Sequence, residues 1–78
     1  LKLLKEENDL GAIVVFNRAV KAYPKYIGLM TNLAQLYEKT KQDNKAIEIY
    51  KLAIQLSKKL KLGQEEGFKK EINKLKKN

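Results

Sequence analysis

Apolar residues recur at helical spacing along the chain, and two segments carry the same pattern. In residues 9–20 and 43–54, small and aromatic residues follow the spacing A-x3-[FY]-x2-A. A shift of 34 residues superposes Ala12, Phe16 and Ala19 on Ala46, Tyr50 and Ala53. The small and the large positions coincide while the polar residues between them differ. The pattern therefore predicts two copies of one helix.

The same periodicity and the helix-ending residues predict an all-α chain. Asp9 and Asp43 are suitable N-caps, Pro24 ends a helix, and Gly63 ends another in the left-handed conformation that glycine tolerates. Five helices are expected: Leu1 to about Glu7, Asp9 to Tyr23, Tyr26 to Thr40, Asp43 to Leu62, and Gln64 to Lys77.

The period and the spacing resemble the tetratricopeptide repeat, a helix-turn-helix unit of 34 residues. One complete copy runs from about Ile27 to Leu60. Its motif positions are Met30 in place of the usual tryptophan, Leu33, Ala34 in place of glycine, Tyr37, Ala46, Tyr50, Ala53, and Lys58 in place of the closing proline. The earlier, shorter copy matches at Leu3 for the tyrosine and then at Ala12, Phe16, Ala19 and Pro24.

This resemblance implies repeats of the α-solenoid type and divides the single domain into three parts. Residues 1–26 would be a partial first repeat, 27–60 a complete repeat and 64–77 a C-terminal capping helix. The methyl side chains of Ala34, Ala46 and Ala53 would let two antiparallel helices approach closely. In the capping helix Phe68, Ile72 and Leu75 form a narrow apolar stripe that is expected to pack on the last repeat.

The composition argues against catalysis by this chain. It contains no cysteine and no histidine, which removes the commonest metal ligands, thiol nucleophiles and the imidazole base. Ser57 is the one serine, and it is expected at the solvated end of a helix without a general base. We predict no catalytic residue, cofactor or metal site. The chain does not begin with methionine and is expected to be a piece of a longer protein.

The net charge of +8 lies mainly at the C-terminal end, because residues 57–78 carry eight lysines and three glutamates, or +5. A lysine-rich surface can bind phosphates, so weak nucleic-acid binding is one alternative function. The single arginine, Arg18, and the scarcity of aromatic residues in the basic segment disfavour it. A solvated lysine-rich face is the simpler interpretation.

The resemblance also implies a function in protein interaction. Members of the family bind peptides or partner helices in a concave groove lined by the first helix of each repeat. The matching positions here are Gly28, Thr31, Asn32, Gln35, Glu38 and Lys39. A non-catalytic interaction or docking module that binds a peptide, partner helix or neighbouring domain is therefore expected. The other alternative is a C-terminal accessory domain of a larger enzyme, such as a bacterial hydrolase.

A second candidate surface emerges from comparison of the two copies. Leu4, Leu10 and Val14 correspond to Glu38, Asn44 and Glu48 in the second copy. An apolar cluster where the internal repeat is polar indicates a contact surface. We expect self-association through this N-terminal end, as a two-fold homodimer, or docking of a neighbouring domain. The longest apolar run, Ala12 to Phe16, is too short to cross a membrane, so a soluble protein of unspecified location is expected.

Overall fold

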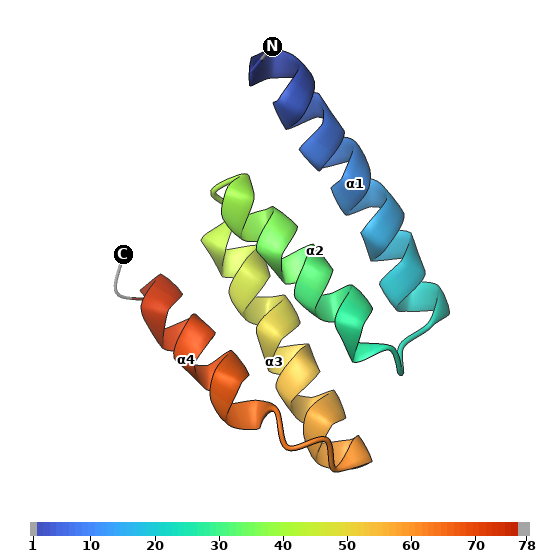
Figure 1. Ribbon diagram of the computed structural model, residues 1–78, viewed down its shortest axis with the longest axis vertical. Coiled ribbons are helices and arrows are strands. Elements are labelled where there is room, and N and C mark those ends of the chain that lie inside the picture. Colours follow the sequence, from blue (N-terminus) through green and yellow to red (C-terminus); the bar gives the residue numbers. More distant parts are fainter. Residues whose placement is uncertain (1, 77–78) are drawn as a thin grey trace.

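The chain is an antiparallel series of helices in the computed structural model, which describes the backbone of residues 2–76 and the side chains of residues 8–76. These residues form four helices and no strand (Figure 1): α1 (Lys2–Ala22), α2 (Ile27–Lys39), α3 (Asp43–Leu60) and α4 (Glu65–Lys76). The protein is all-α, as the sequence predicts.

Each helix packs on its neighbours in the sequence: α1 on α2, α2 on α3, and α3 on α4. The Cα atoms span 41 × 32 × 14 Å. Two helix layers about 9 Å apart, each with a Cα radius of about 2.3 Å, account for the shortest dimension. The chain is therefore two helices thick, in the manner of a helical repeat.

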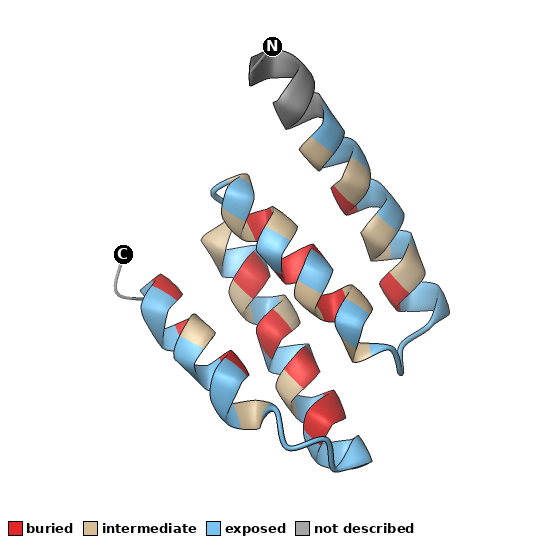
Figure 2. Cartoon of the chain, viewed as in Figure 1, coloured by how far each residue is buried: buried red, intermediate tan, exposed pale blue. Residues whose placement is uncertain are grey.

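The core is centred on the contact between α2 and α3 (Figure 2). Ala34 of α2 and Ala46 and Ala53 of α3 are completely buried, as the close approach of two helices along alanines predicts. Tyr37 and Tyr50 are also buried. From α1, Ile13 and Val20 reach this core. The side-chain amide nitrogen of Asn17 donates a hydrogen bond of 3.1 Å to the Tyr37 hydroxyl.

The expected break between a first helix ending near Glu7 and a second beginning at Asp9 does not occur. One continuous helix, α1, covers Lys2–Ala22, and Asp9 lies inside it rather than at an N-cap. Residues 2–10 contain no glycine or proline and are rich in leucine, lysine and glutamate, which favour helices. Leu1 and the side chain of Leu3 lie outside the described residues.

The ends of α2 and α3 share one turn geometry. At each end a lysine adopts a positive φ, 59° at Lys41 and 58° at Lys61. Two backbone bonds close the turn after α2: Lys41 N–H to Glu38 and Gln42 N–H to Tyr37. The turn after α3 has the equivalent bonds, Lys61 N–H to Lys58 and Leu62 N–H to Ser57. This is the Schellman arrangement, here built without glycine at the left-handed position.

These turns correct two expectations about helix ends. The helix α3 ends at Leu60 rather than Leu62, and Gly63 has a positive φ of 72° two residues beyond Lys61, which terminates the helix. Asp43 is the first residue of α3, where its negative charge suits the helix dipole, but it is not the N-cap. Gln42 holds that position without a side-chain capping bond.

Ser57 is not at a solvated helix end. It is completely buried, and its hydroxyl oxygen accepts a 2.9 Å hydrogen bond from the Gln64 backbone N–H. This bond ties the connecting segment to α3 immediately before α4 begins. The predicted stripe of Phe68, Ile72 and Leu75 is buried in the same region, which confirms its assignment to the core.

Candidate protein-docking surfaces

A hollow lies between α2 and α4, with α3 at its floor. It has a volume of about 320 Å³. We call it the acidic groove, because two glutamates are among the residues that line it: Thr31, Gln35 and Glu38 of α2, Tyr50 of α3, and Gly67, Phe68 and Glu71 of α4. Both glutamates are half-buried. The packing of α2 and α4 against α3 therefore creates a concave surface with polar walls.

A hydrogen bond fixes the floor of the acidic groove. The Tyr50 hydroxyl donates to a carboxylate oxygen of Glu38 at 2.5 Å. Burial raises the pKa of Tyr50 well above its usual value, and the hydrogen bond to Glu38 and the negative charges of Glu38 and Glu71 add to this effect. The Tyr50 ring also packs at 6.0 Å from the ring of Phe68. Tyr50 thus remains a neutral donor that holds the Glu38 carboxylate in place.

A second hollow, of about 270 Å³, lies between α1 and α2. Its lining residues are Phe16, Asn32, Gln35, Leu36 and Lys39. Gln35 therefore lies between the two hollows on the exposed face of α2. The acidic groove contains Glu38, and this second hollow contains Lys39, so the two hollows differ in charge.

The six predicted contact residues of α2 divide between these hollows. Thr31 and Glu38 line the acidic groove, Asn32 and Lys39 line the second hollow, and Gln35 lines both. Gly28 is exposed, and its carbonyl oxygen accepts a 2.9 Å hydrogen bond from the Thr31 hydroxyl. Their role as partner contacts stays a prediction.

Sequence reasoning missed the contribution of other helices to the acidic groove. It gave Tyr50 as a position of the repeat motif and Phe68 as part of the apolar stripe, and gave no role to Gly67 or Glu71. Both rings are buried. Tyr50 and Phe68 nevertheless line the groove as well. The order of the helices could have predicted this contribution, because α4 follows α3 at the place where the first helix of another repeat would stand.

Exposed apolar side chains on α1 distinguish the first copy of the motif from the second. Leu10, Val14 and Val15 are 51%, 52% and 65% exposed. The exposure of Leu10 and Val14 agrees with their assignment to an outward-facing patch, whereas Val15 was not included. The side chain of Leu4 lies outside the described residues. Whether the patch is an interface stays a prediction.

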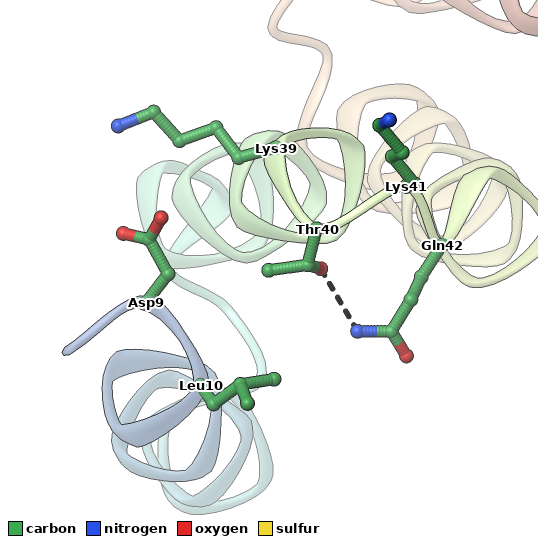
Figure 3. Close-up of a pocket in the computed structure, with 6 residues that line it drawn as sticks. All are labelled: Asp9, Leu10, Lys39, Thr40, Lys41 and Gln42. Carbon is green, nitrogen blue, oxygen red and sulfur yellow. Dashed lines mark hydrogen bonds between the residues drawn. The ribbon is translucent and has the colours of Figure 1, made fainter. Parts of the chain in front are cut away.

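Leu10 also faces a third hollow, at the turn between α2 and α3. In Figure 3 its side chain points from α1 into the space in front of Thr40 and Gln42. The volume is about 330 Å³. The Gln42 side-chain amide donates a 2.8 Å hydrogen bond to the Thr40 hydroxyl, which orders this edge of the hollow. The other lining residues are polar or charged: Asp9, Lys39, Thr40, Lys41 and Gln42.

Metal-binding clusters and membrane-spanning helices are absent from the described residues. No group of three acidic, histidine or cysteine side chains is placed to hold a metal ion. None of the described helices is long and apolar enough to cross a membrane. The lysines of α4 are exposed, and Lys69 pairs with Glu66 at 3.6 Å.

Comparison with known families agrees with the fold. The tetratricopeptide repeat family matches residues 27–60, which are the complete repeat that the 34-residue period predicts. Residues 27–60 therefore form one repeat unit similar to those of the tetratricopeptide family, with α2 and α3 as its two helices. Comparisons with curated proteins and with solved structures gave no match. Repeats of this family generally mediate protein–protein interaction and are typically non-catalytic.

Proposed function

We propose that this chain is a non-catalytic protein-docking module and that it receives a partner helix on the open face of α1. We define this open face as Ala12, Val15, Phe16 and Ala19. The general role of the family in protein interaction supports the class of function. The choice of face rests on the comparison between α1 and α3.

The observation that supports this choice is a difference in burial between equivalent positions of α1 and α3. In α3, which packs between α2 and α4, Ala46 and Ala53 are 0% exposed and Tyr50 is 3% exposed. Their counterparts Ala12, Phe16 and Ala19 in α1 are only half-buried. The same motif is thus covered in one copy and partly open in the other, beside a hollow that Phe16 lines.

The helix that fits this face can be described from α2. Along α2, Leu33, Ala34 and Tyr37 place a small residue next to two large ones, and all three are buried in the core. A small residue permits close approach, and the large residues fill the space on either side. We therefore propose a partner helix with an apolar stripe that contains a small residue flanked by large ones.

A peptide with the sequence of residues 26–41 tests the proposal, because it carries α2, the helix that packs on α3 ahead of it in the same repeat. Fluorescence anisotropy of the labelled peptide, titrated with the full chain, is expected to show saturable binding with a Kd below about 1 mM. Phe16→Glu should abolish this binding. Leu52→Glu, which changes a 45%-exposed leucine of α3, is the matched control and should leave it unchanged.

Two outcomes contradict the proposal: no saturable binding, or equal loss of binding with both variants. Circular dichroism must show that Phe16→Glu remains folded. If it does not, Ala19→Gln replaces it, because Ala19 is only half-buried and glutamine is compatible with a helix.

The homodimer predicted from the sequence uses a different part of α1, the patch of Leu4, Leu10 and Val14, against which α1 of a second copy would pack. Sedimentation equilibrium over a dilution series tests it separately. A dimer that is lost in both Phe16→Glu and a Leu10→Glu, Val14→Glu double variant would extend the interface to Leu10 and Val14. A chain that stays monomeric at every concentration excludes the dimer and leaves docking of another protein's helix as the proposal.

A further inference from the structure

We infer that one end of the molecule, formed by the turn between α1 and α2 and by the end of α3, binds the surface of a membrane that contains anionic lipids. Its exposed hydrophobic side chains enter the interface between headgroups and acyl chains, and its lysines contact the anionic headgroups. We call this end the basic tip, and its residues are Lys21, Tyr23, Lys25, Tyr26, Lys58, Lys59, Leu60, Lys61 and Leu62. It includes no residue of the open face of α1 and is therefore independent of the helix-docking proposal.

The order of the helices brings the two segments of the basic tip to one end of the molecule. The helix α1 ends at Ala22 and α2 begins at Ile27, whereas α3, which runs antiparallel to α2, ends at Leu60. In Figure 1 the turn between α1 and α2 and the end of α3 lie toward the same end, away from the turn between α2 and α3. Every residue of 21–26 and 58–64 is exposed.

Four large hydrophobic side chains of the basic tip are open to solvent. Tyr23 and Tyr26 are 58% and 64% exposed, and Leu60 and Leu62 are 39% and 43% exposed. None of the four is among the residues that form the core or pack against it, so the core does not account for them. Single exposed hydrophobic residues are ordinary on a protein surface, but four at one end indicate a contact.

The two tyrosines are held as a pair. Their ring centroids are 5.8 Å apart with an interplanar angle of 75°, and the Tyr26 backbone N–H donates a 3.2 Å hydrogen bond to the Tyr23 carbonyl oxygen. The turn between α1 and α2 thus presents both rings together. Tyrosine combines an apolar ring with a hydroxyl that stays in contact with water, and it is enriched where membranes meet water.

The charge around these side chains is mainly positive. Residues 10–37 and 49–64, which include both segments of the basic tip, contain no acidic residue. Glu65 and Glu66 begin α4 at the same end, and Glu66 is paired with Lys69 at 3.6 Å. Within the described residues, none of the five lysines of the basic tip forms an ion pair. Lysines near an anionic lipid surface each strengthen binding to it.

The opposite end of the α2–α3 pair lacks this combination. The turn between α2 and α3 carries Lys39 and Lys41, but Glu38 and Asp43 lie beside them and balance their charge. That turn also has no exposed large hydrophobic residue of its own. It therefore provides a matched control surface within the same chain.

The shape and chemistry of the basic tip favour a bilayer over other anionic partners. Protein partners seat their central side chains in pockets, and no residue of the basic tip lines any of the three hollows described above. Nucleic-acid phosphates are best matched by arginine, whereas the cations here are lysines. Leu60 and Leu62 have no counterpart on a nucleic acid, but acyl chains accept leucine side chains.

Flotation of the full chain with vesicles tests the inference. One set of vesicles contains phosphatidylcholine alone, and the other contains phosphatidylcholine mixed with phosphatidylserine. The partition coefficient should be at least about tenfold higher for the mixed vesicles, because their surface is negative. Added salt should lower it, since salt screens the attraction between exposed charges.

Two pairs of lysine variants locate the effect. The double variant Lys59→Gln, Lys61→Gln should lower the partition coefficient about tenfold. The double variant Lys39→Gln, Lys41→Gln makes the same change in net charge and should leave it unchanged. The two pairs are matched in backbone geometry, because Lys41 and Lys61 hold the left-handed positions of equivalent turns. All four side chains are exposed, and circular dichroism should show that both variants are folded.

A tryptophan reporter tests entry of the tyrosine pair into the interface. The chain contains no tryptophan, so Tyr26→Trp introduces a single one. Its fluorescence emission should shift to shorter wavelength with the mixed vesicles, because the indole leaves water. Leu52→Trp, at a 45%-exposed position of α3 outside the basic tip, is the control and should show no shift. The double variant Leu60→Gln, Leu62→Gln keeps the charge and should weaken flotation with the mixed vesicles.

Several results would overturn this inference. They are the absence of flotation, equal partition into the two sets of vesicles, and equal effects of the two lysine pairs. An unshifted emission of Tyr26→Trp in the vesicle-bound protein would exclude entry of this side chain into the interface. Tighter binding to a labelled single-stranded oligonucleotide than to the mixed vesicles would assign the basic tip to nucleic acid instead.

Discussion

The helices α1 and α3 carry the same motif but differ in their neighbours. The helix α3 lies between α2 and α4, whereas within the described residues α1 contacts α2 alone. At equivalent motif positions Tyr50 is buried and Phe16 is half-buried. The motif therefore encodes a surface to which a helix can bind, and the burial of that surface depends on whether a helix is present.

The largest expected difference between the copies is at their aromatic residues. Tyr50→Ala should lower the free energy of unfolding by about 3 to 5 kcal/mol, because it empties a site inside the core. Phe16→Ala should cost about 1 to 2 kcal/mol, because its ring is already partly in water. Chemical denaturation of the two variants measures the difference. Equal losses would show that Phe16 is as well covered as Tyr50.

The second largest difference is expected at the alanines of the two copies. Ala53→Leu should destabilise the protein by about 1 to 3 kcal/mol, because extra methylene groups have no space in the close contact of α2 and α3. Ala19→Leu at the equivalent position should change stability by less than about 0.5 kcal/mol. Thermal melting of both variants checks this. A large loss at Ala19 would mean that this side of α1 is already packed.

The smallest expected effect depends on pH and distinguishes Tyr50 from Phe16, which has no hydroxyl. The pKa of Tyr50 is raised from 10.0 in the folded chain. Its contribution to stability is fully present below pH 10 and is lost as the pH rises above that value, because the unfolded chain loses the tyrosine proton first. By pH 11 the loss should reach about 1 kcal/mol.

Denaturation from pH 8 to 11 measures this effect by difference. The stability of Tyr50→Phe should fall less steeply above pH 10 than that of the unsubstituted chain. Tyr26→Phe, at an exposed tyrosine, is the control. If both variants follow the parent curve, the Tyr50 hydroxyl is not the group responsible.

The repeat and its core could be predicted from the sequence, because they depend on contacts that recur every 34 residues. The alanines between α2 and α3 are buried as expected, and so is the stripe of α4. The continuity of α1 could not be predicted by analogy with the second copy. In the second copy, Lys41 adopts a left-handed conformation and ends one helix before Asp43 begins the next. In the first copy, Asn8 and Asp9 are the only residues of the segment 7–9 that favour a helix end, and α1 continues through them.

The candidate sites were predicted only in part, for a related reason. The exposed face of α2 follows from the family pattern, and five of its six named residues line a hollow. The acidic groove also requires Glu71 and Gly67 from α4, which lies outside the repeat period. Their position relative to Glu38 depends on how α4 packs on α3, and no periodic signal in the chain specifies that packing.

In the part of the chain that the structure describes, each helix contacts only its sequence neighbours, which has a consequence for folding kinetics. The contacts between these helices join segments separated by a single turn, so loop closure costs little entropy at any step. Proteins dominated by such local contacts fold in microseconds to milliseconds. The pair α2 and α3, which shares the most deeply buried residues, can form first, and α1 and α4 can then add to opposite sides in either order.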